Sequence, residues 1–98
     1  MLDRLTSRDF SSHVGEPFAV TAPDGERLDF VLTEVGEHGA APPGAARTPF
    51  FVLWRGPGHR LLPQGTYPVE HAGLGRLDLF IVPIAKEADG YRYEAVFS

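Results

Sequence analysis

The chain has 98 residues, 43% of them hydrophobic, a formal net charge of −4 and no cysteine. A chain this short forms one domain, because neither half would bury a stable core, so residues 1–98 are assigned to a single domain. The missing thiols exclude disulfides, thiolate metal sites and a cysteine nucleophile. The acidic balance disfavours nucleic-acid binding, which needs basic residues to neutralise phosphates.

No segment is typical of export or membrane insertion. Residues 1–10 mix charged and apolar side chains and lack the apolar core of a signal peptide. The longest apolar run, residues 79–85, is much shorter than a bilayer requires. Together with the absence of cysteine, these features predict a cytoplasmic protein without membrane insertion.

A short helix is predicted first. Thr6 is a good N-cap and Asp9 stands three residues later, as in a capping box. The helix is expected to run for about two turns and to end at Val14-Gly15. Leu5 and Phe10 are expected to close one end of a β structure.

The strongest hairpin signal follows. Residues 16–22 and 26–35 predict two strands. Asp24-Gly25 between them favours a tight turn, because glycine tolerates the positive φ that such a turn needs. One face of the return strand carries Leu28, Phe30 and Leu32.

Four more strands are predicted after a loop at residues 36–47 that is rich in Gly, Ala and Pro. Residues 48–55 are apolar on both faces, as in a strand covered on both sides. Residues 65–71 contain Pro68, which cannot donate to a ladder, so this strand is expected at an edge or beside a bulge. Residues 76–85 and 91–97 are the last two strands, joined by a turn at Asp89-Gly90.

These elements predict a mainly β protein: a small antiparallel barrel, or a compact sandwich, of about six strands with a short N-terminal helix. The barrel is favoured, because closure removes exposed strand edges. The interior is expected to be filled by aromatic side chains, which leaves little volume for a small apolar ligand. These side chains are Phe30, Phe50, Trp54, Phe80 and Phe97. No cofactor is expected.

The polar residues do not predict a metal or catalytic site. None of the four histidines, His13, His38, His59 and His71, has a second histidine within ten residues, whereas metal ligands usually recur at short spacings. Asp9 and His13 stand four residues apart, where helical side chains meet. No strained nucleophile turn accompanies them, so a surface pair is expected.

Carboxylates also occur on the predicted strands, at Asp29, Asp78 and Glu94. A catalytic carboxylate pair is one interpretation. Cross-strand ion pairs are preferred, because arginines occupy the same strands. These arginines are Arg27, Arg55, Arg76 and Arg92.

A candidate partner contact lies around two adjacent leucines, Leu61 and Leu62. They follow a polar turn in a proline-rich segment, so one points inward and the other needs cover. Either both plug a barrel end, or one contacts a partner protein. The next strand offers an edge for strand addition. The candidate contact residues are therefore Leu61, Leu62, Tyr67 and Val69.

Nearly the whole chain resembles a family of short bacterial proteins known as a domain of unknown function. The most specific pieces are Leu-Pro-Gln-Gly-Thr-Tyr at residues 62–67 and Tyr-Glu-Ala-Val-Phe at residues 93–97. The resemblance implies no catalytic residue. It implies an accessory or assembly role beside proteins with a phage-tail-collar domain.

The sequence therefore predicts a non-enzymatic structural or protein-interaction module that self-associates or binds a larger protein. The larger protein would be phage-tail-like or a surface fibre. One alternative is a barrel that binds a small apolar ligand. A second is a hydrolase that uses Asp9 and His13 or a carboxylate pair. Neither nucleic acid nor a membrane is expected as a partner.

Overall fold

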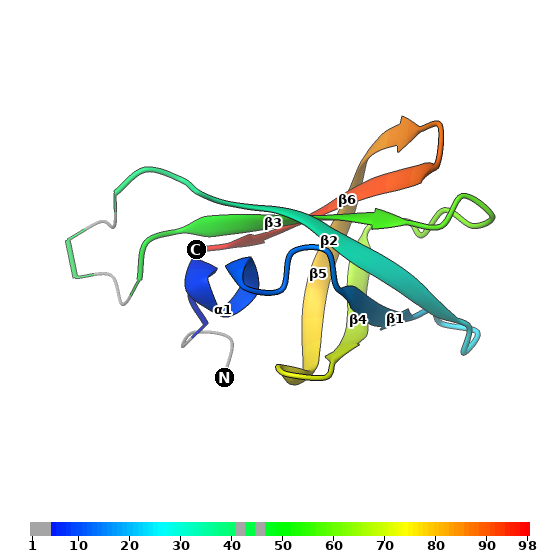
Figure 1. Cartoon of the computed structure of the whole chain (residues 1–98), viewed down its shortest axis with the longest axis horizontal. Helices are drawn as coiled ribbons and strands as arrows, with labels where there is room; N and C mark the ends of the chain where they lie inside the picture. Colours follow the sequence, from blue (N-terminus) through cyan, green and yellow to red (C-terminus); the bar gives the residue numbers. More distant parts are fainter. Residues whose placement is uncertain (1–4, 41–42, 45–46) are drawn as a thin grey trace.

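The computed structural model describes residues 5–40, 43–44 and 47–98. It confirms a closed antiparallel barrel of six strands with one short helix near the N-terminus (Figure 1). Around the barrel the strands follow the order β1-β2-β3-β6-β5-β4. The elements are α1 (Ser7–Ser11), β1 (Pro17–Thr21), β2 (Arg27–Glu37), β3 (Phe50–Gly56), β4 (Gly65–His71), β5 (Gly75–Glu87) and β6 (Gly90–Phe97). Residues 41–42 and 45–46 of the predicted loop lie outside the described residues.

Helix α1 is capped as predicted but is shorter than predicted. The Asp9 carboxylate accepts a hydrogen bond of 2.7 Å from the Thr6 backbone N–H, as in a capping box. The helix has five residues and ends at Ser11, because a tight turn through Gly15 at φ 91° leads into β1. Within the described ranges, no helix is long and apolar enough to cross a membrane.

Phe10 holds α1 against one end of the barrel. Its fully buried ring lies 5.4 Å from the ring of Phe97, 5.9 Å from Phe50 and 6.2 Å from Phe18, measured between centroids. Leu5 packs, partly buried, against the same core. Figure 1 shows α1 beside the left-hand ends of β3 and β6. Closure of one end by Leu5 and Phe10 is therefore confirmed.

Stacked aromatic rings fill the barrel. Phe30 stacks on Tyr93 with 4.4 Å between ring centroids, and Phe50 stacks on Phe97 at 4.5 Å. Trp54 is fully buried beside them. Stacking of this kind adds to the hydrophobic burial that holds the strands together.

Phe80 does not belong to this core, and its predicted place inside the barrel is wrong. Its side chain is 55% exposed. Leu79 and Ile81 on either side of it are buried, and successive side chains of a strand point to opposite faces. Alternation along β5 therefore places Phe80 on the outside.

The ladders between neighbouring strands of the barrel differ in length. Five of the strand pairs contribute five to seven aligned residue pairs, whereas β1 and β4 align only at Ala19↔Glu70 and Val20↔Val69. The β5–β6 ladder runs from Glu87↔Gly90 to Val82↔Glu94 and stops there. Side chains must therefore hold the short β1–β4 seam where its ladder ends.

The prediction that residues 65–71 form a free edge strand is also wrong. β4 pairs with β5 along its whole length and with β1 at Val69 and Glu70. Closure of the barrel, which joins the first strand to the fourth, removes this edge. Pro68 lies just beyond the β1–β4 ladder, where its missing N–H interrupts no pairing with β1.

Candidate functional site

Three of the four predicted contact residues are buried. Leu62, Tyr67 and Val69 are only 1%, 5% and 1% exposed. The Leu62 backbone N–H donates a hydrogen bond of 3.0 Å to the Tyr93 hydroxyl, and the Tyr67 hydroxyl donates to the Pro63 carbonyl. These bonds fix the proline-rich segment with Leu62 inside the barrel.

Leu61 is the exception, with half of its side chain exposed. Leu62 is thus buried in the barrel, whereas Leu61 is not, so the alternative in which both leucines plug the barrel end does not hold for Leu61. Of the four candidates, Leu61 has the accessible side chain. The side chains of Leu62, Tyr67 and Val69 offer almost no surface for contact with another molecule. A role for Leu61 stays a prediction.

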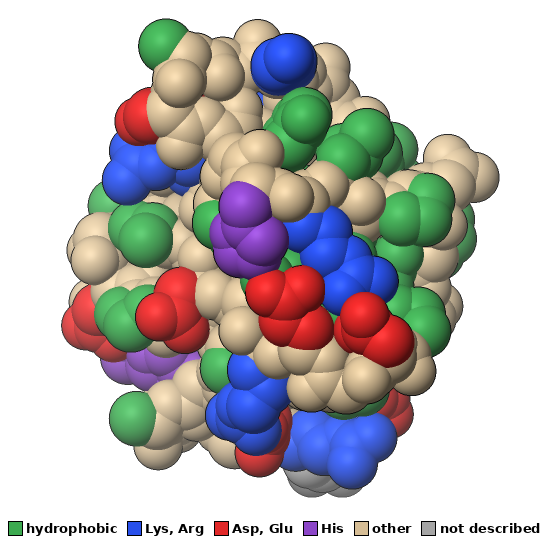
Figure 2. All heavy atoms as spheres, turned by 90° about the vertical axis from the view of Figure 1, so that its right-hand side faces the viewer, with side chains coloured by type: hydrophobic (Ala, Val, Ile, Leu, Met, Phe, Trp, Pro, Cys, Tyr) green, Lys and Arg blue, Asp and Glu red, His purple; other side chains and the backbone are tan. Residues whose placement is uncertain are grey.

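Charged side chains hold the same segment to the β1–β2 turn. Arg60 Nη1 lies 2.8 Å from Asp24 Oδ2 and 3.0 Å from Glu26 Oε1, and His59 Nε2 lies 2.7 Å from Glu26 Oε2. The hydrogen bond from Arg60 lowers the pKa of Asp24, and the bonds from His59 and then Arg60 lower that of Glu26. Figure 2 looks onto this end of the molecule and shows a histidine beside mixed acidic and basic side chains. This largely exposed network links residues 59–60 to the β1–β2 turn.

The most convergent polar cluster consists of His13, Glu16 and His71. Glu16 Oε1 accepts hydrogen bonds from His13 Nδ1 at 2.9 Å and from His71 Nε2 at 2.7 Å. The two imidazole rings lie 4.2 Å apart, measured between centroids. The side chain of His71 is 4% exposed, whereas those of His13 and Glu16 are 24% and 48% exposed.

This cluster replaces the predicted pair of Asp9 and His13. Because α1 ends at Ser11, the two residues do not share a helical face. Asp9 bonds to the Thr6 backbone, and His13 turns to Glu16 instead. The search for ligands at short sequence spacings missed His71, because His71 and Glu16 are 55 residues apart in the sequence. Glu16, three residues after His13, was the available sequence signal.

The three side chains place one possible metal-ligand atom each within 4.8 Å of one another. A histidine that binds a metal through Nε2 normally donates its Nδ1–H to an acceptor. Here Nδ1 of His71 instead accepts two hydrogen bonds, from the Gly73 N–H at 2.9 Å and from the Leu74 N–H at 3.2 Å. The proton of the neutral ring is therefore on Nε2, which points at Glu16. This donor arrangement does not fit a metal site.

The hydrogen bonds of this cluster do not include a nucleophile bonded to a general base, which nucleophilic catalysis needs. A general base must lie within hydrogen-bond reach of the group that it deprotonates. The hydrogen bonds described for these three residues join them to one another and to the backbone at residues 73–74. The nearby Ser11 hydroxyl donates to the Arg8 carbonyl.

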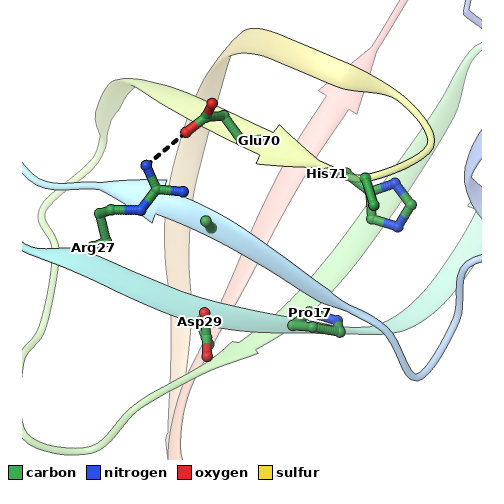
Figure 3. Close-up of a pocket in the computed structure, with 7 residues that line it drawn as sticks. Pro17, Arg27, Asp29, Glu70 and His71 are labelled. Atoms are coloured by element: carbon green, nitrogen blue, oxygen red, sulfur yellow. Dashed lines mark ion pairs between the residues drawn. The ribbon is translucent and has the colours of Figure 1, made fainter.

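The position of the cluster indicates a structural role. Glu16 directly precedes β1, and His71 is the last residue of β4. Their hydrogen bond joins these strands beyond the end of their short ladder. Figure 3 shows the shallow groove of about 340 Å³ along this seam, with Arg27 and Glu70 pointing toward each other at one end and His71 at the other.

Replacing Glu16 with glutamine is expected to weaken the dependence of stability on acid pH. The hydrogen bond from His71 is the main cause that lowers the pKa of Glu16 below its ordinary 4.5; partial desolvation opposes this, and the bond from His13 adds to it. Ionised Glu16 thus contributes stability that is present above the unfolded-state pKa and is lost as the pH falls through the lower folded-state pKa. Glutamine still accepts the His71 N–H but does not titrate.

Urea unfolding between about pH 5 and pH 3 measures this dependence. Glu34→Gln, an exposed change on β2, is the matched control and should unfold like the wild type at each pH. The lowered pKa values of Asp24 and Glu26 also make stability depend on acid pH, and this contribution remains in every variant. Equal losses of stability in Glu16→Gln and in the wild type would contradict the role of the cluster.

The strand arginines form ion pairs, but mostly with other carboxylates than the predicted ones. Of Asp29, Asp78 and Glu94, only Asp78 has an ion pair within the described residues, and its partner Arg76 lies on the same strand. Arg27–Glu70 at 2.8 Å and Arg92–Glu87 at 2.7 Å link different strands, whereas Arg76–Asp78 at 3.5 Å joins two residues of β5. All are substantially exposed, so each stabilises the fold by about 1 kcal/mol at most.

Apolar side chains gather on the outside of three adjacent strands. Phe80 on β5 is 55% exposed and Val96 on β6 is 59% exposed. Val96 aligns with Phe51 on β3, and the ring of Phe51 packs over Gly36, where an added Cβ would overlap it. We call Phe51, Phe80 and Val96 the outer patch.

A groove of about 200 Å³ separates Phe80 from Val96, and we call it the β5–β6 groove. Apolar side chains form most of its walls, together with Arg47 and Ser98 at one end. Arg47 bonds through Nε to the Ser98 carbonyl and through Nη1 to the Leu5 carbonyl. The apolar lining residues are Leu79, Phe80, Ala95, Val96 and Phe97.

A family model described as a domain of unknown function, DUF6916, matches residues 5–97. The chain belongs to this family. The DUF6916 match spans the helix and all six strands of the barrel, so the resemblance to a family of unknown function is confirmed. No curated protein matches the chain, and no solved structure matches it.

Proposed function

We propose that this member of DUF6916 is a non-enzymatic protein-interaction module that binds a partner protein through the outer patch. The observation that carries the proposal is the pairing of Phe80 and Val96, the two most exposed large apolar side chains described, on either side of one groove. Exposed apolar side chains that gather at one place mark contact surfaces, whereas isolated ones need no explanation.

The chemistry of the remaining residues supports a binding role. The His13–Glu16–His71 cluster has hydrogen-bond roles that suit a structural link between strands, and its donors do not suit a metal. Three carboxylates on the strands, those of Glu70, Asp78 and Glu87, are paired with arginines. A hydrolase therefore has less support than an interaction module.

The filled interior argues against a ligand held inside the barrel. Phe30, Tyr93 and Trp54 are fully buried there. Trp54 Nε1 is a buried donor without a hydrogen-bond partner among the described residues. Ligand sites combine an apolar lining with several convergent polar groups, and this single donor does not make such a set.

The partner that we propose is a larger protein of the phage-tail-like or surface-fibre kind, which the chain would assist in the cytoplasm as an accessory or assembly factor. Support comes from the resemblance to short bacterial proteins that accompany phage-tail-collar domains. An acidic chain with mixed surface charge suits a protein partner better than nucleic acid.

Affinity capture from the native host, followed by mass spectrometry, tests the proposal. We expect a reproducible partner with the wild type and at least about a tenfold loss with a Phe80→Ser/Val96→Ser double variant, because burial of each apolar side chain contributes about 1.5–3 kcal/mol. Both residues are exposed, so the variant should melt like the wild type.

Val14→Ser is the control, because Val14 is 48% exposed and belongs neither to the outer patch nor to the lining of the β5–β6 groove. It should capture the same partner in the same amount. Leu61→Ser tests the remaining predicted contact. A partner that is retained by the double variant and lost with Leu61→Ser or Val14→Ser would contradict a contact through the outer patch.

A further inference from the structure

The backbone around the β5–β6 groove has an unusual arrangement. If the register of the β5–β6 ladder continued past Val82↔Glu94, Phe80 would align with Val96. The two strands separate instead. Below this point β5 continues beside β4, with Thr66↔Phe80 aligned, and β6 continues beside β3, with Phe51↔Val96 aligned. In Figure 1 the first part of β5 lies in the lower half of the picture, whereas β6 extends to the left toward the C-terminus.

Each strand therefore has one side paired and one side facing the groove. On β6 this second side belongs to Ala95, Val96 and Phe97, and on β5 it belongs to the residues up to Ile81. Backbone N–H and C=O groups of a strand point alternately to its two sides. An unpaired side is a template for an additional strand, and natural proteins usually cover or interrupt it.

The side chains at the groove suit an extended apolar segment. Leu79, Ala95 and Phe97 are almost fully buried and form an apolar lining, whereas Phe80 and Val96 stand exposed on either side. A strand added there would place alternate side chains outward, next to Phe80 and Val96. Main-chain hydrogen bonds would supply affinity, and the apolar contacts would supply selectivity for side chains.

We propose that the β5–β6 groove binds an extended segment of a partner protein, with apolar residues at alternate positions, which pairs as a strand with the free side of β6. The inference rests on the proposed function and specifies how the partner is held. β6 is the pairing strand because it lines the groove with the consecutive residues Ala95, Val96 and Phe97, whereas β5 contributes only Leu79 and Phe80. The recognised chemistry is the peptide backbone together with small or branched apolar side chains.

A library of random twelve-residue peptides displayed on phage, selected on the whole protein, tests the proposal. We expect enriched sequences with apolar residues at alternate positions. A synthetic copy of an enriched peptide should slow amide hydrogen exchange within residues 95–97, at the N–H groups that face the groove and not β3, because strand pairing protects them. The same peptide with N-methyl groups on alternate residues should bind at least about tenfold more weakly.

Phe80→Ser and Val96→Ser should each weaken binding of the selected peptide, and Val14→Ser should not. If the N-methylated peptide binds equally well and residues 95–97 gain no protection, strand pairing is overturned while contact through the outer patch stands. If no alternating peptide is enriched, or the enriched peptides bind Phe80→Ser and Val96→Ser normally, the groove proposal is overturned. In either case the capture experiment tests the proposed function on its own: a partner that is lost with the Phe80→Ser/Val96→Ser double variant supports contact through the outer patch.

A second copy of the chain is the competing occupant of the groove. Light scattering of the wild type at several concentrations measures this directly. A monomer supports a partner segment. A dimer that Val96→Ser dissociates would overturn the proposal, because β6 would then pair between copies.

Discussion

Replacing Gly90 with alanine is expected to destabilise the barrel by about 3 kcal/mol or more. Gly90 opens β6 with a φ of 151°, a conformation that side chains rarely adopt. An added Cβ would overlap the backbone carbonyl oxygen of Gly56 and lie 3.3 Å from its carbon. Because the obstacle is backbone, rotation of a side chain cannot relieve it.

Gly56 has little freedom to move away from Gly90. A Cβ on Gly56 would lie 2.7 Å from the Tyr93 ring and 2.8 Å from the Phe30 ring, so the strand rests directly on the stacked core. Urea unfolding measures the loss, which should lower the midpoint at an unchanged slope. A domain of ordinary stability, about 5–15 kcal/mol, would lose a large share of it.

Gly58→Ala is the matched control for this experiment. It lies in the adjacent turn, and its added Cβ would meet the Gly90 Cα at an ordinary 3.7 Å. The control should differ from the wild type by about 0.5 kcal/mol at most. If Gly90→Ala were as stable as Gly58→Ala, the close approach of the two strands would be refuted.

Replacing Phe10 with alanine is expected to cost about 3–5 kcal/mol, because it leaves a cavity where a fully buried ring contacts three other rings. The ring is the main link between α1 and the barrel. Thermal and urea unfolding should both show the loss, and α1 should exchange its amide hydrogens faster.

Phe80→Ala is the informative comparison, since it removes the same ring from the outside of β5. With 55% of that side chain exposed, its stability should change by about 0.5 kcal/mol or less. A small loss for Phe10→Ala would show that α1 is not part of the core. A large loss for Phe80→Ala would assign Phe80 to the fold and weaken its proposed contact role.

The phenylalanines that stabilise the fold are therefore different from the one that we propose for binding, although the sequence does not distinguish them. Phe10, Phe30 and Phe50 are fully buried, whereas Phe80 is exposed beside a groove. Composition alone places all of them in the core, because large apolar residues are usually buried there. The exposure of Phe80, and with it a possible role in binding, is seen only when β5 is placed in the barrel.

Local sequence predicts most of the strands and turns correctly. Asp24-Gly25 marks a turn in which Gly25 has a φ of 95°, and Leu28, Phe30 and Leu32 alternate into the core. Thr6 and Asp9 mark the start of α1. These features depend on neighbours within a few residues, so the printed order of side chains is enough to predict them.

Local sequence does not predict which strand ends meet. Residues 65–71 have the features of an edge strand, yet closure pairs them with β1. Leu61 and Leu62 are adjacent, yet Leu62 is buried and Leu61 is half exposed. Hydrogen bonds with the hydroxyl groups of Tyr67 and Tyr93 fix the segment that contains Leu62. Such outcomes depend on contacts between distant parts of the chain.

By itself, the sequence determined a small, acidic, disulfide-free antiparallel β domain with an aromatic interior, because turn residues and alternation are local properties. It favoured a barrel but left a compact sandwich open, and the structure shows the closed barrel. Only the tertiary structure decided where the chemistry lies. It brought His71 to Glu16 across 55 residues, and it separated β5 from β6 below Val82↔Glu94. Both follow from closing a short, strongly curved sheet on itself, which depends on the shape of the whole barrel and leaves unequal seams between its strands.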